Sequence, residues 1–150
     1  MNTTSQIWIG RIITGLVGSL LLLDASVKLA ELAPAIEGTV RLGYPARLVF
    51  VLGVIELLSV ATYLIRRTAF IGAILLTAYF GGAVATHLRI EDPLWTHTFS
   101  SVYVGILTWT GLLLRDVRLR TSVRFSRAAA EPALNESRTV QSRPETVAVR

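Results

Sequence analysis

The chain has 150 residues, of which 52% are apolar and only 17% are charged, and it contains no cysteine. The apolar content excludes a disordered chain over most of the length, and the lack of thiols excludes a disulfide scaffold or a thiol enzyme. The mean hydropathy of +0.56 and the low charge are unusual for a soluble domain. A protein this small and this apolar needs lipid to cover its surface.

Four continuous apolar blocks follow one another along the chain, and each predicts a membrane-spanning helix. They cover residues 7–30, 48–65, 69–88 and 99–114. A spanning helix needs roughly 17–25 residues, and the fourth block reaches that length when Leu94 and Trp95 extend it. Prolines separate the blocks and interrupt none of them, as expected where a proline would remove a helix hydrogen bond. The predicted fold class is all-α, a four-transmembrane-helix bundle with short connections.

The placement of arginines predicts how this bundle is oriented. Arg66 and Arg67 occupy the short connection between the second and third blocks, and five more arginines follow the fourth block. The positive-inside rule puts both groups in the cytoplasm, together with the N- and C-termini. The net charge of +5 therefore requires no nucleic acid as a partner, because anionic lipid head groups suffice for the juxtamembrane arginines.

The chain divides into a transmembrane domain over residues 1–120 and a disordered, basic cytoplasmic tail over residues 121–150. From Ala128 onward it has no aromatic residue and no sustained apolar period. Two interpretations of residues 116–127 stay open. They form either a short basic helix at the membrane surface or a solvated charged extension.

Small side chains predict how the helices pack, because helices in lipid associate through close backbone approach at small residues. The third block has such residues at every fourth position: Ala69, Ala73, Thr77, Gly81 and Ala85. This stripe predicts that the third block is the central packing helix. Packing within one chain is favoured over a dimer seam, and a homo-oligomer is the alternative.

A charged residue inside an apolar block costs several kcal/mol in lipid, so we expect each one to have a structural or functional role. Asp24 and Lys28 are four residues apart on the first block. They form either a self-neutralising ion pair or one wall of a polar site near the outer face. Glu56 stands alone in the middle of the second block. It is either a protonated carboxyl hydrogen-bonded to Thr77, Tyr79 or a backbone carbonyl, or a proton acceptor or ligand contact.

The third block ends in polar residues that we expect at the same outer level as Asp24 and Lys28. The predicted ligand-binding site therefore comprises Asp24, Lys28, Glu56, Thr86, His87 and Arg89. Neither histidine has a metal-ligand spacing, so no metal is predicted. The chain has no nucleophile elbow, phosphate loop or zinc signature, so catalytic residues stay unassigned and a chain without catalytic activity of its own is favoured.

The order of these residues resembles the DoxX-like family of small bacterial membrane proteins, from about Arg11 to Arg120. The segments that carry the resemblance are Asp24 with Lys28, Leu42 to Pro45, Glu56, Gly72 with Ala73, GGAVATHLR from Gly81 to Arg89, Trp109 with Gly111, and Leu114 to Asp116. One departure is that Arg66 and Arg67 stand where the family has a proline-arginine turn. The resemblance implies a four-helix bundle in the inner (cell) membrane.

The resemblance also implies three functional hypotheses. The family name derives from a membrane subunit of a thiosulfate:quinone oxidoreductase, so the first is a non-catalytic membrane subunit or partner protein, with a redox complex as the candidate assembly. The second is a small-molecule site for a quinone-like ligand, with Glu56 and His87 as proton sources. The third is a transporter or proton pathway, for which four short spans leave little room. No cofactor is predicted in the chain itself.

Overall fold

The computed structural model describes residues 3–91, 99–116 and 119, and its described elements are all helices. These are α1 (Thr3–Leu29), α2 (Ala33–Arg41), α3 (Leu48–Leu64), α4 (Ala69–Arg89) and α5 (Phe99–Arg115). The chain divides into two units, residues 1–115 and 116–150, and the five helices form the first. The predicted tail over residues 121–150 lies outside the described residues, as do Leu94, Trp95 and His97.

The four long helices coincide with the four apolar blocks, which confirms that part of the prediction to within a few residues at each end. α3 and α4 are joined by a tight turn at residues 65–68. In that turn the Thr68 hydroxyl donates to the Thr62 carbonyl oxygen, 2.9 Å away. This bond satisfies a carbonyl that the end of α3 leaves without a helical partner.

α2 was not predicted, and it occupies much of the first connection, between the first and second apolar blocks. Pro34 lies in the first turn of α2, where a missing N–H costs nothing because no helical acceptor exists for it. The chain leaves α2 through Gly43, whose φ of +84° favours glycine. A nine-residue helix with Glu37 and Arg41 at its surface is too short and too polar to stand out in a search for apolar runs.

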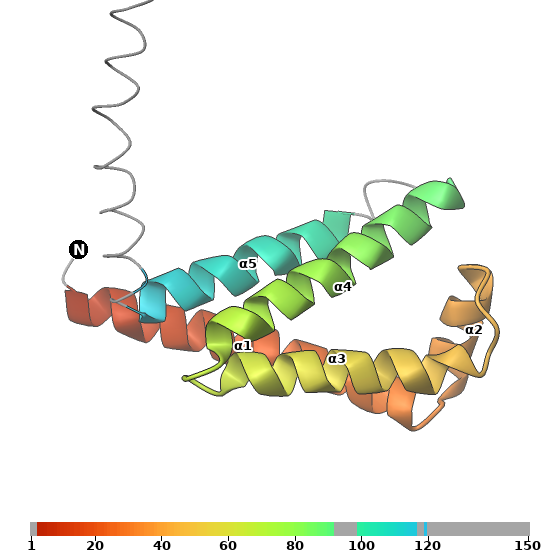
Figure 1. Ribbon diagram of the computed structural model, residues 1–150, viewed down its shortest axis with the longest axis horizontal. Coiled ribbons are helices and arrows are strands. Elements are labelled where there is room, and N and C mark those ends of the chain that lie inside the picture. Colours follow the sequence, from red (N-terminus) through yellow and green to blue (C-terminus); the bar gives the residue numbers. More distant parts are fainter. Residues whose placement is uncertain (1–2, 92–98, 117–118, 120–150) are drawn as a thin grey trace, which may run out of the picture. The chain divides into compact units, whose positions relative to one another are not determined.

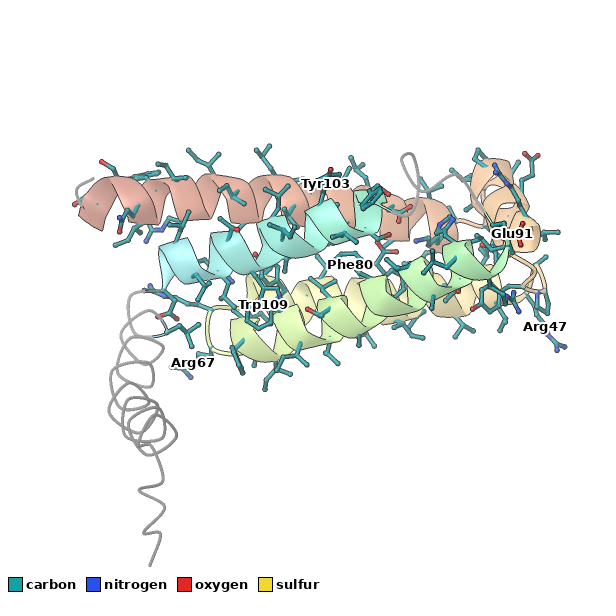
Figure 2. The ribbon with its side chains drawn as sticks, turned by 90° about the horizontal axis from the view of Figure 1, so that it is seen from above. Arg47, Arg67, Phe80, Glu91, Tyr103 and Trp109 are labelled. Carbon is teal, nitrogen blue, oxygen red and sulfur yellow. The ribbon has the colours of Figure 1, made fainter. Side chains whose placement is uncertain are left out.

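The long helices pack in a ring, in which α1 contacts α3 and α5, and α4 contacts the same two helices. One end of the ring, the turn end, holds the start of α1, the α3–α4 turn and the finish of α5. The other end, the α2 end, holds α2 and the last turns of α1 and α4 (Figure 1). Labelled charged side chains lie at these ends, with Arg67 at the turn end and Arg47 and Glu91 at the α2 end (Figure 2).

Apolar side chains such as Val49, Val60 and Leu76 fill much of the interior, but apolar side chains also cover the exterior of the bundle. Large apolar residues on every long helix face outward, among them Leu16, Leu23, Leu58, Ile71 and Ile106. Several hydroxyl side chains and one carboxyl side chain are buried in the interior, namely Thr14, Thr39, Glu56, Ser59, Thr86 and Thr108. α1 and α4 are long and apolar enough to cross a membrane, whereas α3 and α5 are apolar but shorter. An apolar exterior of this extent indicates a membrane protein.

A layer of polar contacts, the tyrosine layer, joins the helices toward the turn end. It consists of Thr14, Tyr63, Thr108 and Arg115. The Tyr63 hydroxyl donates to the Thr108 carbonyl oxygen at 2.9 Å and lies 3.4 Å from the Thr14 hydroxyl. Arg115 donates to the Tyr63 carbonyl oxygen at 2.7 Å. Gly72 packs directly against the Tyr63 backbone, where any Cβ would collide, so α3 and α4 approach most closely here.

The small-residue stripe on α4 packs over only half its length, which corrects the prediction of a central packing helix. Ala69 and Ala73 are buried, but Thr77, Gly81 and Ala85 are exposed. Residues four apart advance by 400° on an α-helix, so each step drifts about 40° around the axis. Over four steps the stripe turns from the interior to the surface. The face that stays buried instead follows Leu76, Phe80 and Thr86.

Candidate functional site

Gly53 on α3 determines where Lys28 lies. A Cβ on Gly53 would stand 2.9 Å from the Lys28 Cβ and 3.1 Å from the Leu29 backbone nitrogen, so only glycine allows α1 to end this close to α3. Glu56 is three residues further along α3 and shares the face of Gly53. The close approach therefore brings the lysine side chain to the middle of α3.

The Lys28 ammonium group is the centre of an interior hydrogen-bond network. Its Nζ donates to Asp24 Oδ2 at 2.7 Å, to Glu56 Oε2 at 2.6 Å and to the Tyr79 hydroxyl at 2.9 Å. An ammonium has three N–H donors, and these three bonds use all of them. We call Asp24, Lys28, Glu56 and Tyr79 the lysine cluster. It draws one helix face from each of α1, α3 and α4.

Glu56 is fully buried, and its two carboxyl oxygens differ. Oε2 accepts from Lys28 and from the Tyr79 hydroxyl, the latter at 3.0 Å. Oε1 is buried and has no hydrogen-bond partner among the described residues. The predicted bond from Tyr79 is present, whereas the predicted alternative donor Thr77 donates to the Ala73 carbonyl and accepts from Trp109. The carboxyl that the sequence shows as isolated is therefore paired with a cation.

Accessibility changes sharply across the lysine cluster. The side chain of Asp24 is 53% exposed, that of Lys28 is 17% exposed and that of Glu56 is not exposed at all. The three groups lie in line, with contacts of 2.7 and 2.6 Å between them. Polar atoms therefore run continuously from the bundle surface at Asp24 to a closed interior position at Glu56.

The predicted residues of α4 form a separate group nearer the α2 end. The Thr86 hydroxyl lies 3.1 Å from the Tyr44 hydroxyl, and Arg89 donates to the Leu42 carbonyl oxygen at 2.9 Å. Thr86 is two turns beyond Tyr79 on α4, about 10 Å along the axis. These bonds tie α4 to the segment after α2, which rises toward α4 in Figure 1. His87 is half-buried beside them.

The structure thus brings three of the six predicted site residues together: Asp24, Lys28 and Glu56. It places Thr86 and Arg89 with the Leu42–Tyr44 segment, where they brace the α2 end. Tyr79 belongs to the cluster but was considered only as a hydrogen-bond donor to Glu56. One signal in the sequence could have indicated the pairing, because Lys28 is the only lysine among 15 basic residues.

No group of three or more histidine, acidic or cysteine side chains that could hold a metal ion occurs among residues 3–91, 99–116 and 119. The lysine cluster is also unsuited to a metal, because a cationic ammonium already occupies the space between its two carboxylates. Its described contacts are hydrogen bonds and ion pairs.

The comparison with family models agrees with this architecture. The model of the DoxX-like family matches residues 12–111, well over half of the chain, and the protein therefore belongs to this family. The matched region includes the whole lysine cluster and the Thr86–Arg89 segment. Searches of curated proteins and of solved structures returned no match.

Proposed function

We propose that the protein is a four-span bundle of the bacterial inner membrane, with both termini in the cytoplasm, that acts as a non-catalytic membrane subunit or partner protein. The observation that carries this proposal is the apolar exterior, in which large apolar side chains of every long helix face outward. A surface of this kind is stable only in lipid or against another apolar surface.

The two shorter helices fit this proposal. α3 and α5 have 17 residues each, the lower limit for crossing the hydrocarbon region. They pack alongside the two longer helices in the same ring, and their outward residues include Phe50, Leu58, Tyr103 and Ile106. Arg66 and Arg67 in the α3–α4 turn supply the positive charge expected on the cytoplasmic side.

Membership of the DoxX-like family makes a redox complex the first candidate assembly for such a subunit. The partner would contact the arginine-rich turn end or the lipid-facing helices. A chain without cysteine contributes no thiol to redox chemistry, so its role there would be to position a partner or a ligand in the membrane.

Topology mapping by cysteine labelling tests the four spans. Because the sequence contains no cysteine, a maleimide reacts only with an introduced one. A single Gly38→Cys change places a thiol on the exposed surface of α2, where glycine has no neighbour within 4 Å. Arg67→Cys is the matched probe at the opposite end. A membrane-impermeant maleimide should label the first variant in intact cells and the second only after permeabilisation. Labelling of both from outside would overturn the four-span arrangement.

A second candidate function, a quinone-like ligand site, is favoured by one observation. Oε1 of Glu56 is the buried polar atom in the lysine cluster that has no described partner. The Lys28 and Tyr79 donors are already engaged, so a ligand would bond to Glu56 Oε1. In this proposal Asp24 and Lys28 position Glu56, and the Thr86–Arg89 segment closes the α2 end.

Binding of a quinone analogue tests this second function. Glu56→Gln and His87→Ala should each weaken binding while the thermal stability of the purified protein stays within a few degrees of wild type. Thr110→Ala, which removes only a local bond to the Ile106 carbonyl on α5, is the matched control. Absent binding in the wild type would remove the ligand site and leave the subunit proposal intact.

A further inference from the structure

The two hydrogen bonds that Glu56 receives end on one oxygen. Lys28 Nζ and the Tyr79 hydroxyl both donate to Oε2, whereas Oε1 has no partner among the described residues although the side chain is fully buried. A buried carboxylate oxygen without a hydrogen-bond donor is costly. A proton bound at Oε1 removes the negative charge of the carboxylate, and this charge is the main part of the cost.

The charge of the cluster points to the same species. The ionisable groups that face Glu56 are Lys28 and Asp24 from α1 and Tyr79 from α4. With both acids ionised, Lys28 protonated and Tyr79 neutral, the lysine cluster has a formal charge of −1. One bound proton makes it neutral. An uncompensated charge in a low-dielectric interior is strongly unfavourable, so the neutral state is preferred.

We propose that Oε1 of Glu56 is a proton-binding site that is occupied at neutral pH. Binding forms one O–H bond at Oε1 and breaks none of the described hydrogen bonds. Oε2 becomes the carbonyl oxygen of a carboxylic acid and still accepts from Lys28 and Tyr79. Lys28 then forms its ion pair with Asp24 alone, and the net charge of Asp24, Lys28 and Glu56 is zero.

The chain of contacts from the bundle surface ends at Oε2 of Glu56, so a proton bound at Oε1 is held away from the half-exposed Asp24. Asp24 is half-exposed and contacts Lys28, which contacts Glu56 in the closed interior. This arrangement keeps the bound proton inside the bundle. The inference goes beyond the membrane-subunit proposal, since it concerns a chemical state of one interior side chain.

Infrared spectroscopy of the full chain in lipid nanodiscs tests the proposal directly. The wild type should show the carbonyl stretch of a protonated, buried carboxyl group at about pH 7. Glu56→Gln should lose this band completely, and Glu37→Gln, a change at an exposed glutamate of α2, should keep it. Identical spectra from the wild type and Glu56→Gln would show that Glu56 is ionised and would overturn the proposal.

A second variant separates proton binding from a structural role. Asp24→Asn removes one negative charge, so Lys28 alone neutralises an ionised Glu56 and the band at neutral pH should weaken. A band of unchanged strength in Asp24→Asn would contradict the charge argument. If Glu56→Gln does not accumulate, Glu56→Asp identifies the band by shifting its frequency. The maleimide experiment reports separately on the membrane topology, so failure of one proposal does not imply failure of the other.

Discussion

The tyrosine layer joins α1, α3 and α5, whereas the lysine cluster joins α1, α3 and α4, and the two regions do so by different contacts. In the tyrosine layer the Tyr63 hydroxyl and carbonyl are both bonded, and glycines let the backbones touch. In the lysine cluster three ionisable groups surround one ammonium, and the buried Oε1 of Glu56 has no described hydrogen-bond partner. Packing explains the first region fully. The second contains charge that packing alone does not require, and this difference locates the candidate site.

The two regions show which contacts stabilise the bundle and which contacts place ionisable groups in its interior. Without a hydrophobic drive between helices, stability comes from close backbone contact and from interhelical hydrogen bonds. Gly72 and Gly111 supply the close contact around Tyr63. Gly53 does so beside Lys28, but there the approach also brings charged groups together. We therefore expect changes in the tyrosine layer to affect folding, and changes in the lysine cluster to affect folding and protonation together.

The largest expected effect is at the closest backbone approach. Gly72→Leu forces a side chain into the Tyr63 backbone and should lower the free energy of unfolding by about 3 kcal/mol, at the upper end for an overpacked site. Gly82→Leu on the same helix meets nothing within 4 Å and should change it by less than about 0.5 kcal/mol. Detergent-titrated unfolding measures both. Equal losses would show that the tyrosine layer is not the main packing contact.

The next effect is at the centre of the lysine cluster. Lys28→Ala removes three hydrogen bonds and should lower the free energy of unfolding by about 2 kcal/mol, since Glu56 Oε2 keeps only the Tyr79 bond. A double-mutant cycle with Glu56→Gln should show coupling of at least about 0.5 kcal/mol. Additive losses would mean that the hydrogen bond between Lys28 and Glu56 does not stabilise the bundle.

The smallest effect, and the one that best distinguishes the two regions, comes from removing a single hydroxyl. Tyr63→Phe removes the contacts with Thr108 and Thr14, and Tyr79→Phe removes the bonds with Glu56 and Lys28. Each change should lower the free energy of unfolding by about 1 kcal/mol. Only Tyr79→Phe should change the carboxyl band of Glu56, because only its hydroxyl bonds to that side chain. A changed band in Tyr63→Phe would show that the two regions are coupled.

The sequence predicts the long helices well because a long apolar run between prolines is compatible with few structures other than a helix. It also locates the charged residues worth attention, since Asp24, Lys28 and Glu56 stand out in apolar surroundings. It predicts α2 poorly, because nine mixed residues have no strong periodic signal. It mispredicts the full packing stripe on α4, because a four-residue repeat drifts around a helix that repeats every 3.6 residues.

From residues alone, then, come the helical class, the apolar exterior and the list of buried charges, all of which depend on local composition and spacing. Which charges meet is decided by the tertiary structure. Lys28 and Glu56 are 28 residues apart, and their contact depends on the close approach at Gly53 and on how far α1 extends along α3. Relative depth and rotation of helices are collective properties of the bundle, so they are fixed only once the helices pack.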